Sequence, residues 1–304
     1  MFCVRIAGKL GSGMRRVLVL LLAFVAVGNL RAAGVGILHE RRSSASDLEV
    51  GGELKGLPAG SARYVRYEDL LRLPQERYTV SDDSNLKGRA EIQGVALETL
   101  ARLLGGAPGS SAEYLMVVAI CSDEYRTNYP REYVAAHHPV LVLRINGEGP
   151  EKWPASEYGG PLGPYLISHP VFKPAFKVHS HEDEAQVPFS VTRIEFRREA
   201  LVFGAIAPRG SVVPEMVEQG YTIARQDCFR CHNMGAEGGT MAGKSWIELG
   251  TMAEEDGRRF RQTIRNPTSV KAGAKMPAHA DYDDATLDAL AAYFRTFAGT
   301  GRTR

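Results

Sequence analysis

The sequence predicts two domains of different fold class, an α+β N-terminal domain followed by an all-α domain. Short strand and helix signals alternate over residues 47–204, whereas helix-period segments separated by loops fill residues 214–304. The chain has 304 residues, of which 44% are apolar and 24% charged. This composition is globular and excludes collagenous, mostly disordered and polytopic membrane proteins.

The elements of the first domain follow from hydrophobic periodicity. Residues 96–104 carry apolar side chains at helical spacing. Apolar runs at residues 114–120 and 140–145 predict buried strands, and alternation over residues 187–196 predicts a half-buried strand.

Three helices are expected in the second domain. The first covers residues 214–228, with Pro214 in its first turn, and the second lies within residues 249–264. The last begins at Asp283, whose acid is favourable at a helix N-terminus, and ends at Gly299. Residues 205–213 are predicted to link the two domains.

The N-terminus is predicted to be an export signal. Residues 1–33 hold five basic residues and no acid, and their apolar run at residues 17–27 is shorter than the ~18 residues that span a bilayer. An uncleaved anchor is the alternative, and Arg15-Arg16 leaves a twin-arginine signal open. Residues 34–46 are predicted to be a tether, and we expect the rest of the chain to be periplasmic.

Charge and cysteine content exclude two further classes. Without residues 1–33 the formal charge changes from +2 to −3, which is too close to balance for a nucleic-acid binder with a dominant basic field. We therefore expect no nucleic-acid partner. Four cysteines are too few for a disulfide scaffold.

The strongest motif is a CxxCH at residues 228–232. Two thiols three residues apart can add to both vinyl groups of haem, and His232 then lies beneath the iron. Zinc would need two further ligands, but the chain has no second CxxC. A CxxC redox pair would begin a helix after a strand, whereas this motif ends a helix. One covalent haem c, held by Cys228 and Cys231, is therefore predicted.

The predicted sixth ligand of the iron is Met276, in a loop stiffened by Pro277. A thioether is a soft, neutral ligand that raises the reduction potential relative to a second imidazole. Met241, Met252 and His279 remain alternatives.

Residues 211–304 resemble a class I cytochrome c domain. The motifs that match are the helix with Gly220-Tyr221 before CxxCH, the Arg265-Asn266-Pro267 segment, the Lys275-Met276-Pro277 loop and the final helix. The resemblance implies covalent haem on Cys228 and Cys231, with His232 as proximal and Met276 as distal ligand. It also implies that Gly220, Tyr221 and Tyr293 form the contact between the first and last helices.

A His/Met-ligated iron has no open position for substrate, so the domain implied by this resemblance transfers electrons. Basic residues are expected to surround the haem edge and to attract an acidic partner; these are Arg258, Arg259, Arg261, Arg265, Lys271 and Lys275.

The first domain resembles the molybdopterin-binding domain of the sulfite-oxidase family. The matching segments are Gly94-Val-Ala-Leu97 and residues 114–125, 141–147, 159–162 and 193–195. In that family the molybdenum-ligating cysteine precedes the segment matching Gly94, but residues 78–93 contain no cysteine here. Molybdopterin is therefore not expected.

Two smaller features of the first domain have alternative interpretations. Cys121 follows a buried strand and is a candidate functional thiol, an inert buried thiol or half of an intermolecular disulfide. His179 and His181 are a possible metal pair or part of an exposed polar loop.

The leading functional prediction is an exported monohaem cytochrome that passes electrons between redox proteins, with the first domain used for docking or assembly. This prediction favours an electron carrier over a catalyst and leaves the enzyme alternative open. One alternative is a molybdenum-dependent oxidase domain that feeds its fused haem. The other is a subunit of a larger respiratory complex.

Overall fold

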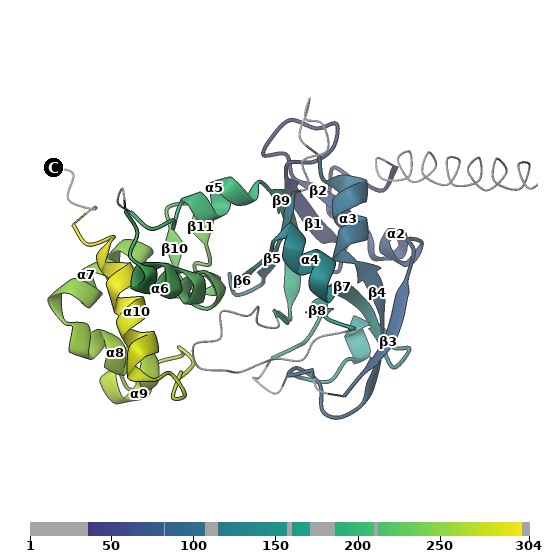
Figure 1. Ribbon diagram of the computed structural model, residues 1–304. Coiled ribbons are helices and arrows are strands. Elements are labelled where there is room, and N and C mark those ends of the chain that lie inside the picture. The colour runs from purple at the N-terminus through teal and green to yellow at the C-terminus, as the bar shows by residue number, and fades with distance from the viewer. Residues whose placement is uncertain are drawn as a thin grey trace, which may run out of the picture.

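The computed structural model describes residues 36–81, 83–106, 115–156, 160–170, 186–209 and 212–299. The predicted export signal and the His179 and His181 pair lie outside these residues. The chain has a mixed α/β N-terminal region and a helical C-terminal domain that lie against each other (Figure 1). Within the described ranges, no helix is both long enough and apolar enough to cross a membrane.

One sheet of the N-terminal region has five strands in the order β2-β1-β9-β5-β6. The pair β1–β9 is parallel and the other pairs are antiparallel. The strands are β1 (Leu48–Gly52), β2 (Arg63–Val65), β5 (Met116–Cys121), β6 (Arg126–Tyr129) and β9 (Val191–Arg197).

A second, antiparallel sheet has four strands in the order β3-β4-β7-β8. Its strands are β3 (Glu76–Val80), β4 (Ala90–Ala96), β7 (Val140–Ile145) and β8 (Leu166–Ser168). The helices of this region are α2 (Tyr67–Leu71), α3 (Leu97–Leu104), α4 (Arg131–His137) and the short 3-10 helix η1 (Pro150–Lys152). Both sheets and α3 contribute to one core, in which Val117, Leu141 and Leu100 are buried together.

The predicted helix at residues 96–104 and the predicted strand at residues 140–145 are confirmed as α3 and β7. The strand predicted over residues 187–196 begins only at Val191. Pro188 has no N–H to donate to a ladder, and Ser190 adopts a φ of 53°, which interrupts extended backbone.

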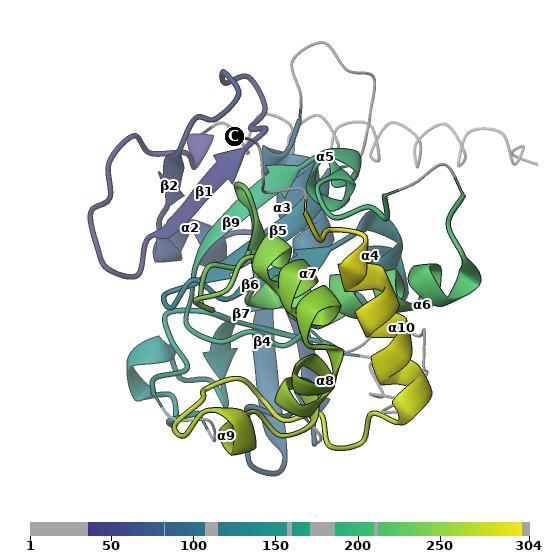
Figure 2. The ribbon, with the colours of Figure 1, turned by 90° about the vertical axis from the view of Figure 1, so that its left-hand side faces the viewer.

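The C-terminal domain follows α5 (Glu199–Gly204). Its elements are α6 (Glu215–Gln226), the 3-10 helix η2 (Cys228–Arg230), the hairpin of β10 (Asn233–Met234) and β11 (Glu237–Gly238), α7 (Trp246–Glu255), α8 (Gly257–Arg265), α9 (Pro267–Val270) and α10 (Asp284–Arg295). Figure 2 shows these helices in front of the sheets.

Four helix boundaries differ from those expected. Pro214 is the N-cap residue of α6 rather than part of its first turn, and α6 ends before the CxxCH motif. The single middle helix is two helices, because Asp256 leaves helical geometry and its side chain caps α8 by accepting from the Arg259 N–H. Helix α10 ends at Arg295, before Gly299.

The contact between α6 and α10 is as expected. A Cβ on Gly220 would overlap the carbonyl of Ala289 and lie 2.7 Å from Cβ of Tyr293. The rings of Tyr221 and Tyr293 lie 5.7 Å apart, centroid to centroid. Only glycine allows the two backbones this approach.

Strand β5 belongs to two cores. Successive side chains of a strand point to opposite faces of the sheet. Val117, Ala119 and Cys121 are buried in the core of the N-terminal region. Met116 and Val118 are buried instead with the apolar residues of the helical domain. The two regions of the chain are therefore packed through a continuous apolar contact.

The helix contact predicts a cost for the smallest substitution at Gly220. Gly220→Ala should lower the free energy of unfolding by about 1–3 kcal/mol, because the added methyl group forces α6 and α10 apart. Chemical denaturation followed by circular dichroism measures this.

Gly204→Ala is the matched control, since no atom lies within 4 Å of a Cβ built there at the end of α5. It should leave stability unchanged or raise it slightly. A Gly220→Ala protein as stable as the unsubstituted chain would contradict this account of the contact.

Candidate haem site

The CxxCH motif forms a tight turn directly after α6. The N–H groups of Cys231 and His232 both donate to the carbonyl oxygen of Cys228, over 3.2 and 2.9 Å. Both thiols and the imidazole therefore leave one turn of backbone. Neither Cys228 nor Cys231 forms a disulfide, and both are half-buried.

The two residues between the cysteines fasten this turn to its surroundings. Phe229 is fully buried, with its ring 5.3 Å from that of Trp246 and 6.4 Å from that of Phe203 on α5. Arg230 lies beside Asp227 and is hydrogen-bonded to Tyr125, which follows β5. The motif thus contacts both parts of the chain.

His232 has the geometry of a metal ligand. Its Nδ1 lies 2.6 Å from the carbonyl oxygen of Lys244. A carbonyl oxygen only accepts, so Nδ1 carries the proton and the lone pair of Nε2 is left to coordinate a metal. Burial lowers the pKa of His232, which keeps the imidazole neutral as coordination requires.

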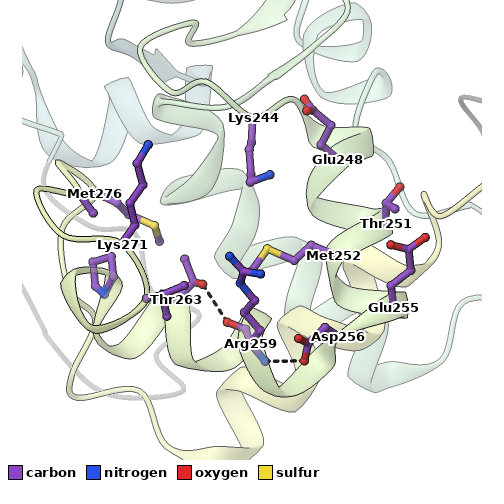
Figure 3. Close-up of a pocket in the computed structure, with 13 residues that line it drawn as sticks. Lys244, Glu248, Thr251, Met252, Glu255, Asp256, Arg259, Thr263, Lys271 and Met276 are labelled. Carbon is purple, nitrogen blue, oxygen red and sulfur yellow. Dashed lines mark hydrogen bonds between the residues drawn. The ribbon is translucent and has the colours of Figure 1, made fainter.

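A cavity of about 480 Å³ lies among α7, α8, α9 and the loop that carries Met276. Met252 and Met276 both line it, and Figure 3 shows their sulfur atoms reaching into it from opposite sides. Lys244, whose carbonyl oxygen holds His232, lines the same cavity. Cys228, Cys231 and His232 do not line it themselves.

The alternative sixth ligands are placed differently from one another. Met252 shares the cavity with Met276. The sulfur of Met241 lies 3.9 Å from that of Cys231, and the residue is 43% exposed. The ring of His279 packs against Tyr282 at 4.7 Å. Of the alternatives, only Met252 lines the cavity.

These groups fit a haem c. Burial raises the pKa of Cys231 to about 11 and raises that of Cys228 further, so both sulfurs stay as neutral thiols. The CxxCH turn thus offers a thiol pair and a neutral imidazole with a fixed tautomer, and the separate cavity that Lys244 lines offers two thioether donors. When bound, haem would supply a one-electron redox step, and the protein would hold and orient it.

Four of the six basic residues expected around the haem edge fall into two groups, and the other two, Arg258 and Lys275, are exposed and do not line the cavity. Arg261 and Arg265 of α8 bind Asp288 and Asp284 of α10, which ties the two helices together. Arg259 and Lys271 line the cavity. Only part of the predicted basic set therefore faces the candidate site.

Cys121 lies in the core of the N-terminal region and is 4% exposed. Burial raises the pKa of this thiol well above its usual range, and the nearby Asp123 and Cys231 act in the same direction. Since the thiolate is the reactive form, this environment makes Cys121 a poor nucleophile. A functional role for it stays a prediction.

A buried polar cluster surrounds His169 in the N-terminal region. Its Nε2 lies 3.0 Å from the hydroxyl of Tyr133, which accepts from the N–H of Gln186. Tyr129 donates to the Gln186 carbonyl oxygen. Sequence reasoning missed Tyr133 and Gln186, because no local pattern connects residues 36 and 53 positions apart.

Comparisons with known proteins define the class of the C-terminal domain. Residues 215–294 match the family described as "Cytochrome C oxidase, cbb3-type, subunit III". This part of the chain is therefore a cytochrome c domain. Domains of this class carry haem, transfer electrons and are typically exported.

Two further similarities cover parts of the chain. "Cytochrome c oxidase subunit 2" of Alkalihalophilus pseudofirmus is 30% identical over 105 residues, which are 32% of this chain and 30% of that protein. The chain thus spans less than a third of this relative. The sulfane dehydrogenase SoxCD from Paracoccus pantotrophus matches 53% of this chain and 40% of that chain, with 18% identity and a TM-score of 0.32. That likeness is too low to define a fold.

The buried His169 predicts acid sensitivity. Burial lowers its pKa from 6.5 to about 3. In the unfolded chain His169 therefore binds a proton below pH 6.5, whereas in the folded chain it binds one only below about pH 3. Stability is full above pH 6.5 and should fall toward pH 3 by about 1.4 kcal/mol per pH unit for this group.

His169→Gln should remove this contribution, so its unfolding free energy should change less steeply between pH 6.5 and pH 5. Denaturant titrations at several pH values measure both slopes. Equal slopes would show that His169 does not titrate as its burial requires.

Proposed function

We propose that the protein is an exported monohaem c-type cytochrome that transfers electrons between redox partners in the periplasm. The observation that carries this proposal is the contact between His232 Nδ1 and the Lys244 carbonyl oxygen, directly after the CxxCH turn. It prepares the imidazole for iron at the position that the motif requires. The cytochrome c domain over residues 215–294 supports the same conclusion.

In this proposal four side chains hold one haem. Cys228 and Cys231 would attach it covalently, and His232 and Met276 would ligate its iron. A neutral nitrogen and a thioether favour the reduced iron more than two imidazoles do. Two protein ligands leave no position for substrate, so the domain passes electrons and does no chemistry at the iron.

The N-terminal domain serves docking or assembly in this proposal. Its assignment as a sulfite-oxidase-like fold rests on short sequence motifs, and residues 78–93 lack the cysteine that would ligate molybdenum. We therefore propose that it holds no molybdopterin.

A subunit of a larger respiratory complex is a second candidate. The family that matches residues 215–294 and the curated relative are both described as oxidase subunits. Copurification with membrane partners after gentle solubilisation would favour this role. A protein recovered alone from the soluble periplasmic fraction would favour the mobile carrier.

The choice of distal ligand is tested by two matched substitutions. Met276→Ala should abolish the long-wavelength sulfur-to-iron absorption band of the oxidised protein, while the haem stays covalently attached. Met252→Ala, which removes the other thioether of the cavity, should leave the band unchanged. Loss of the band in Met252→Ala but not in Met276→Ala would reverse the assignment.

The oxidase alternative is tested by the metal content of the same preparation. Protein purified from a periplasm competent in haem attachment should contain about one iron per chain and no molybdenum or pterin. Molybdenum approaching one per chain would instead establish the molybdenum-dependent oxidase. The substitution Cys228→Ala/Cys231→Ala should remove the covalent haem iron.

A further inference from the structure

A buried ion pair joins the edge strand of the five-stranded sheet to the cytochrome domain. The Arg126 guanidinium on β6 donates to Glu237 on β11 over 2.8 Å. The side chains are only 5% and 13% exposed. Arg197 on β9 also binds Glu237, so two arginines from the N-terminal domain hold one carboxylate of the C-terminal domain.

Glu237 lies on the segment that carries the proximal ligand. The hairpin β10–β11 begins directly after His232 and folds back onto the CxxCH turn. The N–H of Gly239 donates to the carbonyl oxygen of Phe229 over 3.0 Å, and a Cβ on Gly238 would collide with the Phe229 ring. Glu237 is therefore tied to the CxxCH turn through the next two residues, which bond to Phe229 and pack against it.

The ion pair is part of a longer balanced chain of charges. Arg197 binds Glu195 over 2.9 Å, Arg193 binds the same Glu195, and Arg193 also approaches Glu49 at 3.4 Å. With Arg126 and Glu237 this makes three cations and three anions. Removing either charge of the Arg126–Glu237 pair leaves an unbalanced and largely buried charge beside the motif, where salt screens it poorly.

We propose that Arg126 and Arg197 are positioning residues of the haem site, which hold the proximal segment through Glu237 and set the reduction potential of the haem by their charge balance. The proposal rests on the proposed function, because it requires haem at the CxxCH motif. A second tie, from the Thr240 N–H to the Glu124 carbonyl oxygen, joins the same two segments. The N-terminal domain is thereby part of the redox centre.

The sign of the shift in the haem reduction potential tests whether the charges of the ion pair set that potential. Ferric haem carries one more positive charge than ferrous haem. Glu237→Gln leaves excess positive charge beside the haem, so it should raise the reduction potential of the holoprotein. Arg126→Gln leaves excess negative charge and should lower it. The reduction potential of the double variant should be close to that of the unsubstituted protein. Arg126→Lys keeps the charge, so its potential should be much closer to that of the unsubstituted protein than the potential of Arg126→Gln is.

The matched control is Glu53→Gln. Glu53 is as shielded as Glu237, with 14% exposure, but its partner is Arg198 in the N-terminal domain. This variant makes the same charge change away from the haem segment and should leave the potential nearly unchanged.

Hydrogen exchange at the amides of Gly239 and Thr240 tests whether the ion pair holds the segment that follows His232 in place. Exchange should speed up in Glu237→Gln and Arg126→Gln but not in Glu53→Gln. Shifts of the same sign in both charge variants would indicate general loosening and would overturn the electrostatic role. If Glu237→Gln does not fold, the comparison of Arg126→Gln with Arg126→Lys decides the question.

Different results would overturn the proposed function and the proposed role of the ion pair. An unsubstituted protein without covalent haem overturns the proposed function. A haem-loaded protein whose potential and exchange are the same in all variants overturns only the role of the ion pair.

Discussion

The packing of Phe229 constrains the rest of the structure. This residue lies between the two cysteines, so its burial fixes the turn that would attach haem. Its ring lies in the apolar cluster that also contains Met116 and Val118 of β5. Because β5 is an interior strand of the five-stranded sheet, the position of the motif depends on the fold of the N-terminal domain.

This arrangement gives the candidate site two different sides. The cysteine turn and its hairpin face the sheet, where Arg126, Arg197 and Tyr125 contact them. The cavity lined by Met276 lies among α7, α8 and α9. Figure 1 shows these helices on the side of the helical domain farther from the sheets. In the proposed function a redox partner would approach this second side, where the cations Lys244, Arg259 and Lys271 are balanced by the acids Glu248, Glu255 and Asp256.

Local patterns in the sequence were sufficient to predict many of the helices and strands. The apolar spacing of residues 96–104 predicted α3, and the acid at Asp283 predicted the start of α10, where its side chain accepts from the Thr286 N–H. The CxxCH motif and Met276 were visible because their chemistry depends on residue type and short spacing.

Other features depended on contacts that no local pattern encodes. Arg126 and Glu237 are 111 residues apart, and each alone resembles an ordinary surface charge. The apolar run in β5 predicted a buried strand but not that its two faces belong to different cores. The break between α7 and α8 was missed, because the backbone turn at Asp256 interrupts a pattern that reads as one helix.

The most direct test of the account is the covalent state of the CxxCH motif in protein made by cells that attach haem. Arg230 lies between the two cysteines, so trypsin can cut the chain inside the motif. We expect mass spectrometry to recover Cys228 and Cys231 in one species that carries a single haem. Separate peptides with unmodified thiols would contradict it.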